Sequence, residues 1–152
     1  MRMALTLKSS AFEAGKEIPS KYTCEGTDLA LQLSWSGAPE GTKSFALLMD
    51  DPDAPRGTWV HWVVVDLPPT ATSLPEGGAL PSGARSGTNS WGRTGYGGPC
   101  PPSGRHRYFF KLYALDTALN QLAKPTKEQL ESAMKGHVLA HAELMGTYQK
   151  KR

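Results

Sequence analysis

The 152-residue sequence has few charged residues, little cysteine and no long hydrophobic run. Charged residues make up only 20%, which is too few for a coiled coil, and a 9% share of aromatic residues is too high for a disordered chain. The most apolar stretch, residues 59–67, contains His61 and Asp66 and is about half as long as a membrane-spanning helix. We therefore expect one soluble globular domain over residues 1–152, without stable membrane insertion.

Cysteine and net charge say little about partners but something about location. Residues 1–8 hold too short an apolar stretch for a secretory signal, so we expect a cytoplasmic protein. Cys24 and Cys100 are the only cysteines, and although they could form one disulfide, we expect two free thiols in a reducing compartment. The formal net charge of +3 comes from scattered basic residues, so we expect no nucleic-acid partner.

Common catalytic fingerprints are also missing. The sequence has no Gly-x-Ser-x-Gly, no Walker loop and no dinucleotide-binding fingerprint. It has no Cys-x-x-Cys pair either, which argues against a metal site. His137 and His141 have no functional context, and we interpret them as structural. We expect no cofactor and no metal.

What the sequence does contain is β-strand pattern. Short apolar or alternating segments bounded by turn residues predict strands over 31–35, 44–49, 59–66 and 106–115. Thr126 as N-cap with Gln129 three residues later predicts a helix, and Gly136 suits the position after its end. Alternation from 138 to 147 then predicts a final strand, with a continued helix as the competitor. Many strands and one or two helices indicate a mainly β fold of packed antiparallel sheets.

Two loops have the composition of functional segments. Residues 50–57 are rich in Asp and Pro and directly follow an apolar strand. Residues 68–105 are dense in Gly, Pro and Ser, with room for a hidden short strand or turn. Loops of this length in compact domains are often binding loops.

Two histidines lie at the starts of strands beside these loops. Alternation puts His106 on the same face as Tyr108, and it puts His61 on the same face as Trp59 and Val63. We expect the two imidazoles to converge on one pocket.

Asp51 to Pro55 would add carboxylates to that pocket on a segment stiffened by two prolines. Histidines can donate to anionic oxygens, and main-chain N–H groups of Gly97 and Gly98 can approach a ligand closely. A carboxylate fits if it accepts a hydrogen bond from a histidine N–H, a protonated phosphate oxygen or a ligand amine. The set suits a small phosphorylated or carboxylated ligand.

Two other chemistries use nearly the same residues. Asp and His side chains could bind a metal. Alternatively, Cys100 with His106 and Asp51 could form a nucleophile–base–acid set, although Cys100 lies between two prolines, with no helix N-terminus to lower its pKa.

Several segments resemble one known family, the phosphatidylethanolamine-binding proteins, also called the Raf kinase inhibitor protein family. Residues 51–55, Asp-Pro-Asp-Ala-Pro, look like its first signature, and residues 104–108, Gly-Arg-His-Arg-Tyr, look like its second. Residues 96–102, Ser34-Trp35 and residues 142–148 are similar to its bacterial and archaeal branch. The resemblance covers about residues 5–150.

This resemblance implies an antiparallel β-sandwich with one or two peripheral helices near the C-terminus. It also implies an anion pocket for phosphate-like groups and phosphoethanolamine head groups at one end of a sheet. Carried over residue by residue, Asp53 braces the loop, and the ligand-binding residues are Asp51, Pro55, Trp59, His61, Gly98, Pro102, His106 and Tyr108. The family implies binding or regulation without catalysis, so we expect no enzyme and no catalytic residue, and relatives of this type imply a homodimer.

The sequence departs from the family in two places. Residues 30–33, Ala-Leu-Gln-Leu, lack two prolines that usually precede Ser34-Trp35, and the chain ends soon after Tyr148 without the longer tail of animal relatives. A second functional hypothesis is a surface-acting inhibitor or scaffold for a kinase or protease, in which the pocket is a vestige or a switch.

Overall fold

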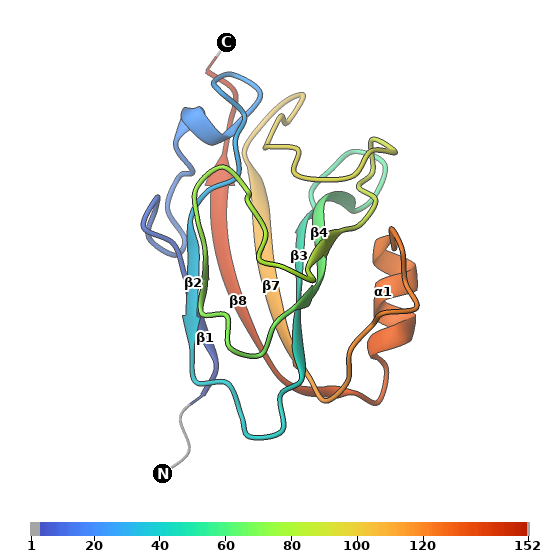
Figure 1. The fold of residues 1–152 in the computed structure, drawn as a ribbon. Helices are drawn as coiled ribbons and strands as arrows, with labels where there is room; N and C mark the ends of the chain where they lie inside the picture. The colour runs from blue at the N-terminus through green and yellow to red at the C-terminus, as the bar shows by residue number, and fades with distance from the viewer. Residues whose placement is uncertain (1–3, 152) are drawn as a thin grey trace.

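The computed structural model describes residues 4–151, so residues 1–3 and 152 of the expected domain lie outside it (Figure 1). A short 3₁₀ helix, η1 (Ser20–Tyr22), follows the first strand, and α1 (Lys127–Met134) precedes the last. The strands are β1 (Thr6–Lys8), β2 (Leu33–Ser36), β3 (Ser44–Asp51), β4 (Trp59–Leu67), β5 (Ser73–Leu74), β6 (Arg85–Ser86), β7 (His106–Leu115) and β8 (Val138–Tyr148).

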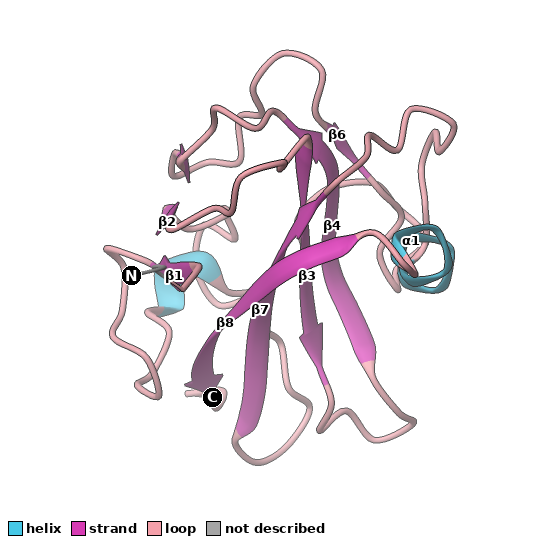
Figure 2. Ribbon diagram, turned by 90° about the horizontal axis from the view of Figure 1, so that it is seen from below, coloured by secondary structure: helices cyan, strands magenta, loops and turns pink. Residues whose placement is uncertain are grey.

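The strands form two antiparallel sheets. One has the order β1-β2-β5 and the other the order β6-β4-β3-β7-β8. The smaller sheet and α1 lie on opposite sides of the larger one (Figure 2). The predicted mainly β sandwich with a peripheral helix near the C-terminus is confirmed. In the described part of the chain, no helix is long and apolar enough to cross a membrane.

Two apolar clusters fix the larger sheet in its central position. Along β3, Phe45, Leu47 and Met49 join the cluster between the sheets, whereas Ala46 and Leu48 join the cluster beneath α1. All eight residues of β3 are buried, because this strand is covered on both faces. Burying one large aliphatic side chain contributes about 1.5–3 kcal/mol, so packing on both faces stabilises β3.

Most of the predicted elements are present, with small shifts at their ends. The helix has the predicted capping box between Thr126 and Gln129, and Gly136 takes a positive φ of 82° just beyond it. Residues 138–148 form a strand rather than a continued helix, since they pair along the whole of β7. The loop of residues 68–105 does contain short strands, β5 and β6, and the predicted strand at 31–35 is observed at Leu33–Ser36.

The antiparallel order brings several strand ends together at one end of the larger sheet. β3 and β8 end there, while β4 and β7 begin there, at the top of Figure 1. The loop between β3 and β4 and the last part of the 68–105 loop lie at the same end (Figure 1). Residues far apart in sequence therefore meet where the strand pairing stops.

Candidate functional site: a pocket at the end of the larger sheet

A pocket of about 340 Å³ lies at this end of the sheet. The residues that line it are Asp51, Ala54, Pro55, Trp59, His61, Trp91, Cys100, Pro101, Pro102, His106 and Tyr108. Seven of the eight residues expected from the sequence are among them, and Gly98 is not. The structure brings together residues from the end of β3, the start of β4 and the start of β7.

His106 is held by a carboxylate at the base of the pocket. Its Nδ1 lies 2.6 Å from Oδ2 of Asp51, and both residues are buried. The other carboxylate oxygen, Oδ1, accepts the main-chain N–H of Asp53 at 2.8 Å. Because a carboxylate only accepts hydrogen bonds, Nδ1 of His106 carries the proton, and Nε2 is the ring nitrogen left for a ligand.

His61 is held by the main chain instead. Its Nδ1 donates to the carbonyl oxygen of Gly97 at 2.7 Å, and the N–H of Gly97 donates back to the carbonyl of His61 at 3.0 Å. Burial lowers the pKa of His61, against the smaller opposing effects of the Gly97 carbonyl and the Asp51 and Asp50 charges. At neutral pH the ring is therefore uncharged, with Nε2 as a hydrogen-bond acceptor.

A bulge in β4 aims His61 at the pocket. Met49 pairs with Trp62 and Asp50 pairs with Val60, which leaves His61 as an extra residue between them. The expectation that His61 shares a face with Val63 is therefore wrong. Val63 packs in the cluster beneath α1, whereas the His61 ring meets the ring of Tyr108 edge to face at 5.2 Å.

Tyr108 brings an unpartnered hydroxyl to the pocket. The residue is fully buried, and its hydroxyl makes no hydrogen bond of good geometry within residues 4–151, with the Asp51 carboxylate and the Cys100 main chain as its polar neighbours. Burial, and then the negative charge of Asp51, raise the pKa of Tyr108, so the hydroxyl stays protonated. An unpaired buried hydroxyl costs about 1–3 kcal/mol, a cost that a ligand oxygen accepting its proton would remove.

Two half-exposed tryptophans form the rim. Trp59 and Trp91 are 37% and 38% exposed, and their rings meet edge to face at 5.5 Å. The Trp91 ring also contacts the His61 ring at 5.1 Å. Sequence reasoning missed Trp91, since it lies in a loop without periodicity, where a single tryptophan among Gly and Ser was the only signal.

The loop between β3 and β4 is braced from outside the pocket. Both carboxylate oxygens of Asp53 accept from the Arg107 guanidinium, and Oδ2 also accepts the Arg107 main-chain N–H. The Arg107 side chain lowers the pKa of Asp53 to about 2. Asp53 is not among the pocket-lining residues, in keeping with the bracing role expected for it, and Pro55 two residues later lines the wall.

Asp50 is adjacent to Asp51 but serves the opposite face of the sheet. It is buried, and its Oδ2 accepts from Lys111 at 3.3 Å and from Lys127 at 3.1 Å. Lys127 is the first residue of α1, so this ion pair ties the helix to β3. The two neighbouring carboxylates are therefore divided between the pocket and the helix.

Gly98 supports the pocket from behind. Its N–H donates to Oδ1 of Asp28 at 2.9 Å. A Cβ atom at this position would lie 2.2 Å from the carbonyl oxygen of Tyr22, so only glycine fits. Gly98 follows Gly97, whose carbonyl oxygen accepts the hydrogen bond from His61. Gly98 therefore affects the pocket through the position of Gly97.

The expectation of two free thiols is wrong, because Cys24 and Cys100 form a disulfide. Their Cα atoms are 5.4 Å apart, a usual separation for a disulfide, although 76 residues separate them in sequence. The Cys24 main-chain N–H also donates to the carbonyl of Pro99 at 3.1 Å. With its sulfur in this bond, Cys100 has no thiolate to act as the nucleophile of a Cys–His–Asp set.

The other two histidines lie elsewhere. His137 hydrogen-bonds Asp116 at 2.8 Å, and the His141 ring contacts Tyr113. His137 directly precedes β8 and His141 lies within it. Four residues of extended chain span about 13 Å, so the two rings are too far apart to bind one metal ion. Within residues 4–151 no group of three or more His, Cys, Asp or Glu residues is arranged to hold a metal.

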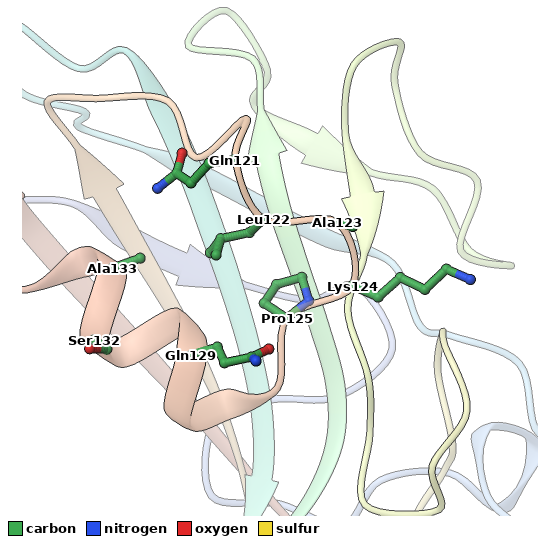
Figure 3. A pocket seen from close by; sticks show the side chains of 8 residues that line it. All are labelled: Gln121, Leu122, Ala123, Lys124, Pro125, Gln129, Ser132 and Ala133. Carbon is green, nitrogen blue, oxygen red and sulfur yellow. The ribbon is translucent and has the colours of Figure 1, made fainter.

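A larger hollow of about 550 Å³ lies between α1 and the segment before it (Figure 3). It is lined by Gln121, Leu122, Ala123, Lys124, Pro125, Gln129, Ser132 and Ala133. Lys124, its one ionisable lining residue, points away from the helix (Figure 3). None of the residues expected to bind a ligand lines this hollow, so the smaller pocket is the candidate site.

The fold and the site together define a class of protein. It is an antiparallel β-sandwich with a histidine-containing pocket at one end of its larger sheet. A profile of the family described as phosphatidylethanolamine-binding protein matches residues 8–149. A UPF0098 protein of Methanothermobacter thermautotrophicus is 50% identical over 150 residues, which cover 96% of this chain and 99% of that protein. The chain belongs to the phosphatidylethanolamine-binding protein family, as its signatures predicted.

Solved structures of similar proteins agree with this assignment. A crystal structure described as a phosphatidylethanolamine-binding protein homologue, CT736 of Chlamydia trachomatis, matches with a TM-score of 0.93 at 46% identity, covering 97% of this chain and 99% of that one. Escherichia coli YbcL, described as a member of the mammalian family, matches with a TM-score of 0.91 at 36% identity, over 98% of this chain and 100% of that one.

Proposed function

We propose that this protein binds a small phosphate monoester or a similar anion in the pocket at the end of the larger sheet, without chemical turnover. One observation carries the proposal. Three groups that can bind phosphate oxygens, from His61, His106 and Tyr108, line a single pocket of about 340 Å³. The protein holds Nδ1 of each imidazole and leaves the tyrosine hydroxyl unpaired.

Each group has a distinct part in binding the anion. The hydroxyl of Tyr108 would donate to a phosphate oxygen, and Nε2 of His106 would donate to another in the imidazolium form, which carries a proton on both ring nitrogens. Asp51 keeps the His106 ring oriented through Nδ1 and offsets the charge when that ring is protonated. Uncharged His61 would accept the proton of a phosphate hydroxyl, which is available because the second pKa of a phosphate monoester is about 6.

The size of the pocket favours a small ligand. A volume of about 340 Å³ is at the lower end of the range of about 300–1,000 Å³ for small-molecule sites. It can hold a head group or a phosphorylated side chain, but not the two acyl chains of a phospholipid. Because the sulfur of Cys100 is in a disulfide, the pocket holds no free thiol nucleophile, and we propose a binding protein rather than an enzyme.

A surface-acting inhibitor of a kinase or protease is the second candidate. The exposed Trp59 and Trp91 at the rim favour it, because tryptophans often dominate the energetics of protein interfaces. This candidate alone predicts partner binding that survives loss of the pocket histidines.

Location and assembly remain predictions. The Cys24–Cys100 disulfide weakens the prediction of a cytoplasmic location, since disulfides persist mainly in oxidising compartments. The homodimer that the family implies is a further prediction, which size measurement in solution would test.

A titration of the histidine ring protons by NMR tests the binding site. With inorganic phosphate and with O-phosphoethanolamine, the His61 and His106 signals are expected to shift and saturate together, while those of His137 and His141 stay in place. The complex of His61 with O-phosphoethanolamine holds one proton that the separated partners lack at pH 8, so the affinity for this monoester should be weaker at pH 8 than at pH 6. Above the second pKa of this monoester, about 6, the proton shared with His61 gives a limiting slope of about tenfold per pH unit. Unmoved His61 and His106 signals would refute the site.

Tyr108→Phe separates a binding role for the hydroxyl from a structural one. Removing an unpaired buried hydroxyl is expected to stabilise the free protein by about 1 kcal/mol and to weaken phosphate binding about tenfold. Thermal melting and calorimetric titration measure the two effects. Tyr148→Phe is the matched control, because that buried hydroxyl bonds Ser20 and Glu25, so its loss should destabilise the fold and leave affinity unchanged.

A further inference from the structure

The Cys24–Cys100 disulfide lies between two hollows. On one side Cys100 lines the anion pocket. On the other side both cysteines line a hollow of about 470 Å³ together with Glu25 and Lys150. Cys100 is therefore part of the pocket wall, and the disulfide links that wall to an outer surface.

The outer hollow gives a thiol access to the bond. Cys24 is an exposed residue, Cys100 is half-buried, and both line this hollow, so we take Cys24 as the side from which an incoming thiolate approaches. Lys150 lines the same hollow, and its positive charge favours the approach of an anion. Glu25 is engaged there by the Tyr148 hydroxyl and the Lys151 main-chain N–H.

The wall itself is held by few other links. Within the described chain, no main-chain to main-chain hydrogen bond involves residues 100–104, and two of these residues are prolines without an N–H. The nearest such bond runs from Cys24 N–H to the Pro99 carbonyl, beside the disulfide. Pro101 and Pro102 line the pocket on this segment, so the disulfide fixes the position of that wall.

We propose that the Cys24–Cys100 disulfide is a thiol-exchange site for a dithiol reductant and that its opening weakens the anion pocket. The second part rests on the proposed function. A thiolate of the dithiol attacks Sγ of Cys24, the Sγ–Sγ bond breaks, and Cys100 leaves as a thiolate that takes up a proton. The second thiol then attacks the mixed disulfide and releases Cys24. Two electrons pass to the protein, and the reductant leaves as a disulfide.

The first experiment measures exchange in the folded protein. Native protein is incubated with millimolar dithiothreitol, quenched with iodoacetamide and analysed by mass spectrometry, beside a sample in denaturant. The native disulfide is expected to open at a rate within about tenfold of the denatured rate, since both cysteines line an open hollow and Cys24 is an exposed residue. Lys150→Gln should slow opening by anionic glutathione severalfold and opening by neutral 2-mercaptoethanol less. A native disulfide that opens only after unfolding overturns the exchange site.

The second experiment measures the effect on the pocket. Oxidised protein, protein kept reduced with dithiothreitol, and the Cys24→Ser/Cys100→Ser variant are titrated with inorganic phosphate, with circular dichroism confirming the fold of each. The reduced protein and the variant are expected to bind about tenfold more weakly, because the wall is no longer preorganised. Equal affinities in the oxidised and reduced states of the folded wild type overturn the control of the pocket.

The two proposals fail in different ways. If the oxidised protein binds no phosphate, the proposed function fails. Tryptophan fluorescence then reports whether the wall moves, because Trp91 and Trp59 are at the rim of the same pocket. A change in emission on reduction, absent from the double-serine variant, supports coupling between the disulfide and the wall. An unchanged emission overturns that coupling.

Discussion

Replacing His106 by alanine is expected to weaken the binding of inorganic phosphate by about tenfold to a hundredfold. The reason is the loss of a charge-assisted hydrogen bond, worth about 1.5–3 kcal/mol, from a ring that Asp51 holds in place at 2.6 Å. Each 1.4 kcal/mol corresponds to about a factor of ten in affinity. Isothermal titration calorimetry at pH 6 provides the measurement.

The alanine variant also leaves Asp51 buried without its partner, so stability needs its own control. His106→Asn retains an amide N–H that can donate to Asp51 but lacks the second ring nitrogen, and it should lose affinity while unfolding closer to the wild-type temperature. His141 lies near the start of β8, whereas the pocket lies at the end of the sheet where β8 finishes. The His141→Ala variant should therefore bind phosphate like the wild type. Wild-type affinity in the folded His106→Asn protein would remove His106 from the proposed site.

The strands that carry the site were predictable because their signals are local. The valine-rich run of β4, the aromatic run of β7 and the apolar run of β3 each stand between turn residues, and the observed bounds of β7 match the prediction. His61 and His106 meet because β4 and β7 flank β3 on its two sides and begin at the same end. The antiparallel arrangement of these three strands brings the starts of β4 and β7 to the same end of the sheet.

The orientation of His61 depends on pairing rather than on the β4 sequence. Simple alternation placed Val63 on the pocket face, and the bulge opposite Met49 and Asp50 reverses that assignment. A bulge of this kind is determined by how two strands register against each other, which the sequence of one strand does not contain. The same limit applies to Asp50 and Asp51, whose division between helix and pocket follows from the two covered faces of β3.

The contacts of the 68–105 loop were the least predictable part of the site. Trp91 and the Cys24–Cys100 bond both depend on this loop, which has no periodicity from which a facing direction could be deduced. Its glycines and prolines indicate turns but not what those turns approach. Gly98 is an example, since a close approach was predicted for a ligand and is observed for the main chain around Tyr22.

Gly98→Ala is expected to be the most destabilising of the single substitutions considered. The added methyl group would lie 2.2 Å from the Tyr22 carbonyl oxygen and 2.3 Å from Oδ1 of Asp28, so the main chain must move. Overpacking of this kind costs about 3 kcal/mol, and for a chain of this length the melting temperature should fall by about 10 °C.

Gly104→Ala is the matched control for this substitution, because it lies in the same loop with open space around it. A φ of +73° is its only strain, which costs about 1–2 kcal/mol. Folded Gly98→Ala protein should also show a shifted His61 ring signal before any ligand is added, since the neighbouring Gly97 carbonyl fixes that ring. If Gly98→Ala melts no lower than Gly104→Ala and its His61 signal is unchanged, then Gly98 does not hold the pocket from behind, and direct contact with the ligand becomes the better explanation for a glycine at this position.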